Sequence, residues 1–261
     1  MTWIACNAIL MIALPIALAL ALRRSAPSFW PLLGAGALSF AGSQLVHLPL
    51  LAAWQWLTRS EWIPGVGGAA GAIAVGVLAA GCEEPARWLV LRRMNDRGRE
   101  AAWVFGAGHG GLEALALGAL ALVGAINVGA ASSMSVSDFV ALGVPEATAE
   151  STVEQVAQAL AMPWYDALGG AFERAITLPF HLACSVLVMA SLRRRRAWPF
   201  VIALVAHAMI DAAIGLLGEL HQRGWALEME LTALSVPFTV LVLVWAAQAE
   251  PSEAARSDGS S

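Results

Sequence analysis

The chain has 261 residues, of which 59% are hydrophobic and 13% are charged. A soluble domain of this length carries about 25% charged residues, so the composition excludes a soluble protein and indicates an integral membrane protein. The net charge of −4, without a basic patch, argues against a nucleic-acid partner. Cys6, Cys82 and Cys184 lack the spacing of metal ligands, and we expect them to be small buried side chains.

Apolar segments of about 20 residues, the length that a helix needs to cross a bilayer, recur along the chain. In order they are Thr2–Leu22, Phe29–Leu57, Val66–Leu91, Ala101–Val123, Leu168–Leu192, Trp198–Gly218 and Leu227–Gln248. They predict an all-α, polytopic membrane helix bundle of about seven transmembrane helices, in a single domain over residues 1–248. Arg23 and Arg24 follow the first segment, whereas a secretory signal has its basic residues first, so we expect a retained helix.

Arginines in the loops predict the orientation of the bundle. Three alternate loops hold Arg23, Arg24, Arg92, Arg93, Arg97, Arg99 and Arg193 to Arg196. The other short loops hold only Arg59 and Arg223. Because basic loops stay in the cytoplasm, we expect the N-terminus on the outer side of the membrane and the C-terminus in the cytoplasm.

The one long connection, residues 124–167, falls on the outer side in this orientation and is acidic. Within it, Ser151 and Glu154 have the spacing of a capping box, and the apolar residues that follow recur at helical spacing. We therefore expect a short amphipathic helix at the outer surface. Residues 249–261 are rich in Ser, Ala and Glu and predict a disordered cytoplasmic tail.

Ionisable side chains interrupt several apolar segments, although each charge costs about 2.5–3.5 kcal/mol at the bilayer centre. They are Glu83, Glu84 and Arg87 in the third segment, His109 and Glu113 in the fourth, Glu173, Arg174 and His181 in the fifth, and His207 and Asp211 in the sixth; the second adds His47 and the polar but uncharged Gln44. Such residues are rare in membrane helices and usually functional.

Three pairs of these residues stand four positions apart and so share one helix face. They are Glu83 with Arg87, His109 with Glu113, and His207 with Asp211. A rise of 1.5 Å per residue places the first member of each pair roughly 13–15 Å from the cytoplasmic boundary, and His181 roughly 18 Å from it. We therefore predict one polar cavity to which four helices contribute. His47, Glu173 and Arg174 come out nearer the outer surface, and we expect them in another part of the bundle.

Each feature has a purely structural alternative. A single membrane histidine commonly joins helices, and Glu83 with Arg87 could form only an intrahelical ion pair. The glycines around His109 predict close helix packing, and Pro85 removes one helical hydrogen bond. Three pairs at one depth nevertheless favour a functional cavity.

The motifs Glu83-Glu84-x-x-Arg87, Phe105-x-x-x-His109 and His207-x-x-x-Asp211 resemble those of the CAAX-protease and bacteriocin-processing (abortive infection) superfamily. More closely, the chain is similar to the YhfC-type intramembrane peptidases, a bacterial family described as intramembrane metalloproteases. That similarity includes Gly108-His109-Gly110-x-x-Glu113, Phe172-Glu173-Arg174 with His181, and Ser43-Gln44-x-x-His47. It covers nearly the whole chain and implies hydrolysis of a peptide bond in a membrane-bound peptide or protein. It also implies a multi-pass protein of a bacterial plasma (inner) membrane. The CAAX-protease pattern has one more residue before the Arg, and its last motif often ends in Asn.

The resemblance implies a role for each motif residue. Glu83 would be the general base, with Glu84 as the alternative, because a carboxylate removed from water holds a proton more tightly. His109 would help to position the water, and His207 would stabilise the oxyanion. Asp211 would accept a hydrogen bond from the His207 ring and fix its tautomer, or would donate one if it is protonated.

Supporting roles follow for the neighbouring groups. Glu84 and Arg87 would act beside the reacting atoms, with Arg87 holding a carboxylate in place. Glu113 would orient the His109 ring, and His181 would line the site.

The same groups could bind zinc through His109, His207 and either Glu83 or Glu113. No His-Glu-x-x-His motif is present, so the sequence leaves the metal open; we favour a metal-free glutamate mechanism, with Zn²⁺ as the alternative. The competing class is a proton-coupled transporter or another non-enzymatic membrane protein, because buried Glu and His chains also relay protons.

Overall fold

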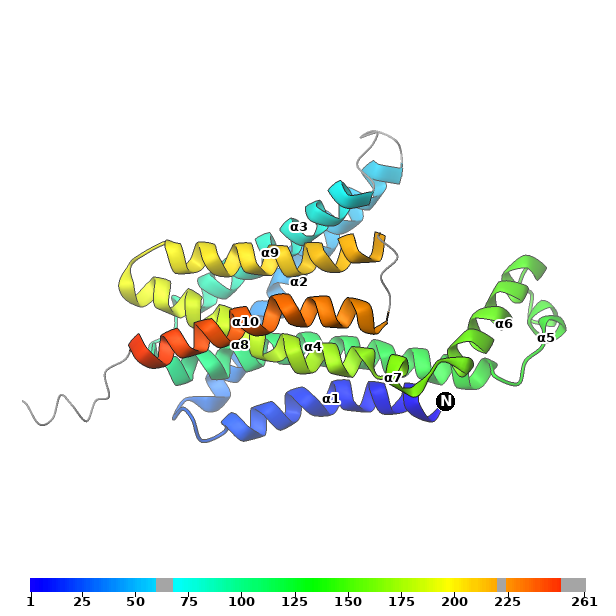
Figure 1. The fold of residues 1–261 in the computed structure, drawn as a ribbon, viewed down its shortest axis with the longest axis horizontal. Coiled ribbons are helices and arrows are strands. Elements are labelled where there is room, and N and C mark those ends of the chain that lie inside the picture. The colour runs from blue at the N-terminus through cyan, green and yellow to red at the C-terminus, as the bar shows by residue number, and fades with distance from the viewer. Residues whose placement is uncertain (60–67, 220–223, 250–261) are drawn as a thin grey trace, which may run out of the picture.

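The computed structural model describes residues 1–59, 68–219 and 224–249, and these residues form ten helices and no strands (Figure 1). The helices are α1 (Thr2–Leu22), α2 (Phe29–Arg59), α3 (Gly68–Leu91), α4 (Arg99–Ala131), α5 (Val136–Ala141), α6 (Glu146–Ala161), α7 (Trp164–Ala167), α8 (Gly169–Arg194), α9 (Trp198–Glu219) and α10 (Trp225–Ala249). All but α5, α6 and α7 are long and apolar enough to cross a membrane, which makes seven candidate spans. The predicted all-α membrane bundle is therefore confirmed.

Several predicted boundaries differ from the observed ones by one or two residues, and the end of α4 differs by more. Helix α4 continues to Ala131, past the predicted end at Val123, because neither a proline nor a charge interrupts it there. Ala249, placed in the predicted tail, belongs to α10. The rest of that tail, residues 250–261, lies outside the described part of the chain.

Helix α8 occupies the centre of the bundle. In the apolar 18-residue stretch of α8, 67% of the residues are buried inside the protein, whereas the corresponding share is 17–28% in the other six spans. The outer helices turn large apolar side chains outward, as Leu38 (71% exposed), Leu45 (80%) and Leu241 (70%) illustrate. Surfaces of this kind are stable against lipid rather than water.

The helices approach one another closely where glycines face a neighbouring backbone. A Cβ on Gly36 of α2 would lie 2.0 Å from the carbonyl oxygen of Phe105, and one on Gly108 of α4 would lie 2.0 Å from that of Leu33. Helix α3 meets α9 in the same way, since a Cβ on Gly76 would lie 2.4 Å from the Ala212 nitrogen. These contacts confirm the close packing predicted for the glycines of α4, and they set the positions of α2, α3, α4 and α9 around the core.

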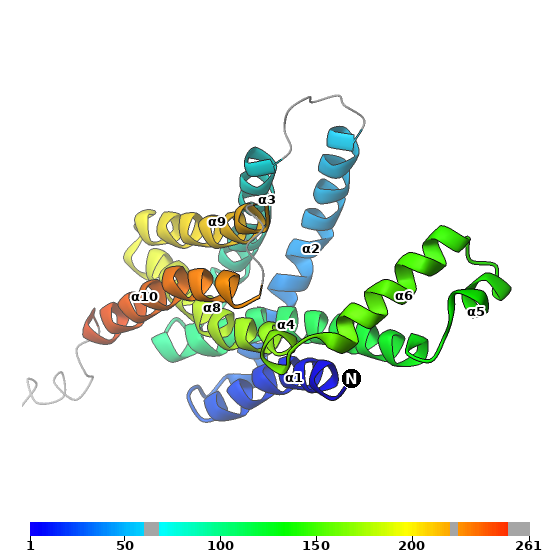
Figure 2. The ribbon, with the colours of Figure 1, turned by 45° about the vertical axis from the view of Figure 1, so that its right-hand side comes forward.

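The long connection contains α5, α6 and α7, and the first two project beyond one end of the bundle (Figure 2). The capping box lies at Ser135 and Asp138, where the Ser135 N–H and hydroxyl hold the pKa of the Asp138 carboxyl below its usual range. The capping box predicted at Ser151 is wrong. Helix α6 already begins at Glu146 after Pro145, so Ser151 is an internal residue whose hydroxyl accepts from Gln155.

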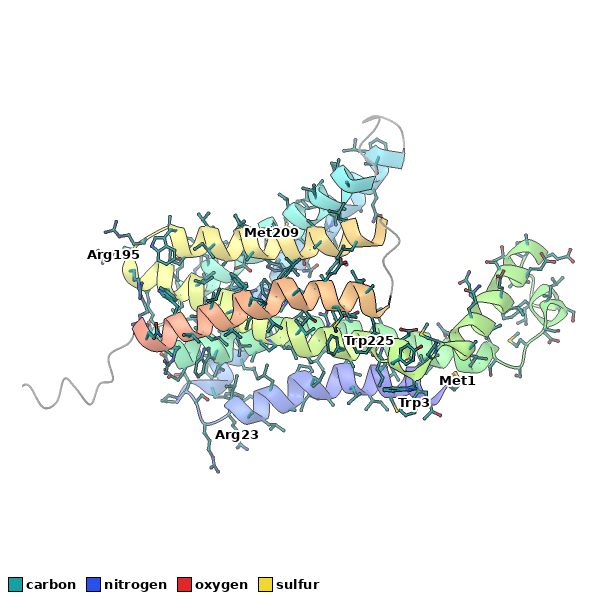
Figure 3. All side chains as sticks on the ribbon, in the orientation of Figure 1. Met1, Trp3, Arg23, Arg195, Met209 and Trp225 are labelled. Atoms are coloured by element: carbon teal, nitrogen blue, oxygen red, sulfur yellow. The ribbon has the colours of Figure 1, made fainter. Side chains whose placement is uncertain are left out.

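The loop arginines predict that one end of the bundle is basic and the other is not, and the two ends differ in this way. Figure 3 shows Arg23 and Arg195 at one end, and Met1, Trp3 and Trp225 at the other. Which of the two ends faces the cytoplasm stays a prediction.

Candidate active site

Four helices bring their ionisable residues together in the middle of the bundle. Helix α3 supplies Glu83, Glu84 and Arg87, α4 supplies His109 and Glu113, α8 supplies Glu173, Arg174 and His181, and α9 supplies His207 and Asp211. Glu84, Arg87 and His109 are completely buried, and the other two histidines nearly so. Buried charge of this density is stable only where the groups pair with one another.

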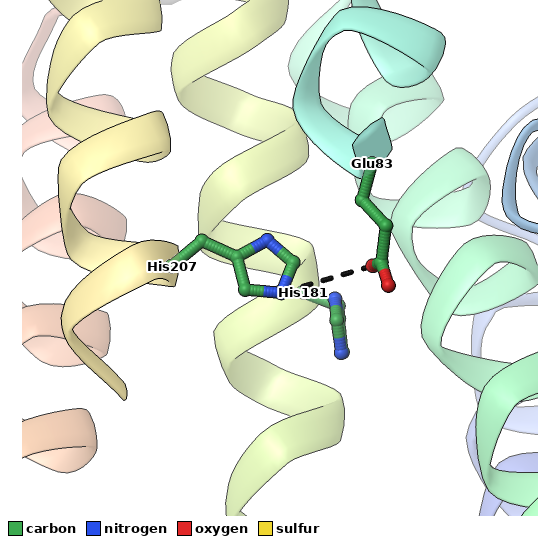
Figure 4. A group of neighbouring side chains, drawn as sticks. All are labelled: Glu83, His181 and His207. Carbon is green, nitrogen blue, oxygen red and sulfur yellow. Dashed lines mark ion pairs between the residues drawn. The ribbon is translucent and has the colours of Figure 1, made fainter. Parts of the chain in front are cut away.

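Glu83 of α3 is the point at which three other helices meet. Its Oε1 accepts a hydrogen bond from Gln44 Nε2 at 3.2 Å. Its Oε2 lies 3.2 Å from His109 Nε2 and 3.7 Å from His207 Nε2. Figure 4 shows the carboxylate of Glu83 directed toward the His181 and His207 rings. The residues that the sequence placed at one depth thus lie within contact distance.

The orientation of His109 is fixed from its other side by Ser39 of α2. The Ser39 hydroxyl donates to the Gly36 carbonyl at 2.7 Å and lies 2.7 Å from His109 Nδ1. A hydroxyl has one proton to donate, so Ser39 accepts from His109 Nδ1–H. The Nε2 atom is thereby held toward Glu83. Sequence reasoning missed Ser39, whose only signal is its spacing from Ser43 on the same helix face.

Glu84 occupies a closed environment. It accepts from Arg87 Nε at 3.1 Å and from His207 Nδ1 at 2.8 Å. Arg87 also donates to Ser185 Oγ at 2.7 Å and to the His181 carbonyl at 3.3 Å. The carboxylate next to Arg87 is therefore that of Glu84, and this carboxylate sets the His207 tautomer. Sequence reasoning assigned the tautomer to Asp211, which instead lies 3.5 Å from His207 Nε2.

The His181 ring lies between Arg87 and Glu113. Its Nδ1 is 3.2 Å from Arg87 Nη2, and its Nε2 is 2.8 Å from Glu113 Oε2. Guanidinium groups only donate, so Nδ1 accepts and Nε2–H points to Glu113. The ring packs on Gly110, where a Cβ would lie 2.7 Å from His181 Cδ2.

The predicted contact of Glu113 with His109 is wrong. Glu113 Oε1 instead pairs with Arg174 Nη1 at 2.6 Å, and its other oxygen faces His181. Both ring nitrogens of His109 are already engaged, by Ser39 and Glu83. His109 and Glu113 share a face of α4, but they lie one turn apart along the helix and therefore contact different side chains.

A polar cavity of about 70 Å³ extends from this cluster. Its lining includes Glu83, Glu113, Glu173, Arg174, His207 and Asp211. A space of this size admits a few water molecules between several polar partners. The expectation that Glu173 and Arg174 belong to another part of the bundle is therefore wrong, because the cavity runs along the helices and residues of different depth line it. His47 likewise reaches the cluster, through Gln44 Oε1 at 3.1 Å.

A group of possible metal donors lies at the inner end of the cavity. The donor atoms of Glu83, His181 and His207 all lie within 4.8 Å of one another. The sequence predicted His109 and His207 with either Glu83 or Glu113, whereas the structure brings His181, and not His109, into this group. The spacing on α4 could not reveal that substitution, because it depends on how α8 is rotated.

Comparison with known proteins identifies the family of this chain. The sequence model of the YhfC intramembrane metalloproteases matches residues 10–236. The chain belongs to this family. It is also 30% identical over 152 residues to the uncharacterized membrane protein YhfC of Bacillus subtilis (strain 168), a match that covers 57% of each chain. No solved structure matches. The predicted YhfC resemblance is confirmed, whereas the relation to CAAX proteases stays a prediction.

Membership of this family and the seven apolar helices make the chain a multi-pass membrane protein. A bacterial plasma membrane fits the similarity to the Bacillus protein. The chain spans a little over half the length of that relative, so substrate and activity are proposals.

Proposed function

We propose that the chain is an intramembrane peptidase that hydrolyses a peptide bond of a membrane-bound protein or peptide at the Glu83, His181 and His207 cluster. The observation that carries this proposal is the meeting of these three donor groups at a cavity with room for water. The family that the chain belongs to supports it. Amide hydrolysis needs an activated water, a partner for the oxyanion and a proton for the leaving amine.

Glu83, His181 and His207 are the residues that would hold a metal ion. Two histidines and one carboxylate are typical of catalytic zinc sites. His207 fits this role because Glu84 binds its Nδ1 and leaves Nε2 directed to Glu83. For His181 to bind the ion through Nε2, the ring proton would have to leave Nε2, which faces Glu113, and sit on Nδ1, and Arg87 Nη2 would have to turn away from Nδ1. When bound, zinc would polarise the peptide carbonyl and make water more acidic.

The remaining polar groups of the cavity move the protons. Glu113 and Asp211 both line it, so either can accept a proton from water and return it to the leaving amine. Glu84 and Arg87 keep the His207 and His181 rings in place from the closed side. His109 Nε2 lies 3.2 Å from the Glu83 carboxylate, so the two are joined by a hydrogen bond when a proton lies between them.

A metal-free version uses the same cavity, with Glu83 itself as the base. The contact between His109 Nε2 and Glu83 Oε2 favours it, because a proton taken from water can be held between these two atoms. The two versions assign opposite importance to His181, which is a ligand in the first and a lining residue in the second.

The test uses purified protein in lipid vesicles with a library of tethered peptides. We expect zinc to co-purify, chelation to stop cleavage and added zinc to restore it. His181→Ala and His207→Ala should lose both zinc and cleavage, whereas the control Leu45→Ala, on the exposed outer face of α2, should keep both. Cleavage without zinc and insensitive to chelation would select the metal-free version. Protein that binds no zinc and cleaves nothing in the library would contradict the peptidase proposal.

A transporter is the second candidate, favoured by one set of contacts. The His47 ring meets Gln44, and Gln44 donates to Glu83, so polar groups lead from the cluster along α2. Buried chains of this kind also carry protons. Vesicles with an imposed pH gradient separate the two candidates: a proton flux lost in Glu83→Gln, without any peptide cleavage by the wild type, would favour transport.

A further inference from the structure

The cavity at the candidate active site is elongated along the bundle. On α8 its lining runs from His181 back to Glu173, and on α9 from His207 forward to Ile214. At a rise of 1.5 Å per residue these stretches measure about 12 Å and about 10 Å. Helix α8 begins at Gly169, so Glu173 lies about one turn from the end of the helix. The cavity thus approaches the end of the bundle from which α5 and α6 project.

The opposite direction is closed by apolar packing. Helix α8 is buried at every position from Phe180 to Met189. The Phe180 ring lies 5.7 Å from the His207 ring and 5.4 Å from that of Phe238, between centroids. Beyond it the large apolar core fills the space between α3, α4, α8, α9 and α10. A cavity of about 80 Å³ opens at that end beside Arg99, Val186 and Met189, but its lining includes no residue of the cluster.

The lining of the elongated part is suited to water. Arg174 pairs with Glu113 and with Glu173, which puts three charged groups along the passage. Thr177 Oγ1 and Arg174 Nε are buried and have no hydrogen-bond partner among the described residues. Buried polar atoms without a protein partner are commonly bonded to ordered water.

We infer that water reaches the cluster through this passage, from the end of the bundle at which α8 begins and α9 ends. Helix α8 contributes Thr177 and Arg174 to it, and α9 contributes Ile214. That this water is consumed in hydrolysis rests on the proposed function, but the route itself is a property of the protein without substrate.

Cysteine accessibility tests the route. Thr177→Cys and Ile214→Cys are introduced singly after Cys6, Cys82 and Cys184 have been replaced by Ala. The full chain in oriented vesicles is then treated with a charged, membrane-impermeant methanethiosulfonate. Ala175→Cys and Met209→Cys are the matched controls, since both side chains are exposed on the outside of the same two helices (Figure 3 labels Met209). Asp138→Cys and Arg196→Cys mark the two ends of the bundle.

We expect Thr177→Cys and Ile214→Cys to react at least about tenfold faster than their controls, because the thiolate that reacts forms only in contact with water. Reaction should occur from the side on which Asp138→Cys is labelled. Rates equal to those of the controls, or reaction from the side of Arg196→Cys, would overturn the inference. Labelling needs no substrate, so a wet passage in a protein without peptidase activity would leave the route standing and remove only its proposed use.

Discussion

Glu83 and Glu84 are neighbours in the chain, yet they belong to two different regions of the molecule. Successive residues of a helix point about 100° apart, so one carboxylate reaches the cavity and the other the closed core. Glu84 is fully enclosed by Arg87 and His207, whereas Glu83 borders the cavity beside His109 and Gln44. The closed region holds the rings in position, and the cavity region presents atoms that can react. Charge alone does not distinguish the two roles; access to water does.

The strongest way to separate the two regions is to neutralise the cavity carboxylate. We expect Glu83→Gln to lower cleavage by about 10²- to 10⁴-fold, because the variant keeps the shape of the side chain but loses the carboxylate, which is a metal ligand in one proposed version and the base in the other. Thermal unfolding in detergent should stay close to that of the wild type. A variant that unfolds instead would place Glu83 with the closed region.

Removal of Arg87 should act on the fold. Arg87→Ala leaves the carboxylate of Glu84 buried without its cationic partner, which costs about 3–5 kcal/mol of unfolding free energy. Arg87→Lys keeps the charge but loses the separate donors to His181 and Ser185, so we expect an intermediate loss. Reversible unfolding in mixed micelles measures both. Equal stability of Arg87→Ala and the wild type would be incompatible with a closed ion-pair network.

A methyl group at Gly110 tests the boundary between the regions, where His181 packs. Gly110→Ala places a Cβ 2.7 Å from the ring, and we expect a loss of about 1–3 kcal/mol together with reduced zinc binding. Gly111→Ala is the matched control, because its Cβ would meet only Pro15 at 3.6 Å, an ordinary contact. Similar behaviour of the two variants in unfolding and zinc measurements would show that the ring is not held by this contact.

The smallest effect on stability is expected at Asp211, which is partly open to the cavity. Its carboxylate is 27% exposed and lies 3.5 Å from His207. We expect Asp211→Asn to change the unfolding free energy by less than about 1 kcal/mol, as is usual for accessible ion pairs. A loss as large as that of Arg87→Ala would move Asp211 into the closed region.

The spans were predictable because length and polarity alone decide whether a segment can cross a bilayer. The layer of Glu83, His109 and His207 was predictable as well, from helix rise and loop charge. The partners of each group were not. Glu113 meets His181 rather than His109 because the rotation of each helix, and not its sequence period, selects the neighbour. Ser39 gave almost no signal, because a single serine in an apolar helix has many possible roles.

The backbone contact between α2 and α4 has a consequence for variation in this protein. Helix α2 carries Ser39 and Gln44 to the cluster, and its distance from α4 is set where Gly36 and Gly108 meet carbonyl oxygens. Its outward side chains, such as Leu45, take no part in that spacing. The lipid-facing surface of α2 can therefore adapt to bilayers of different composition or thickness while the reactive centre keeps its dimensions.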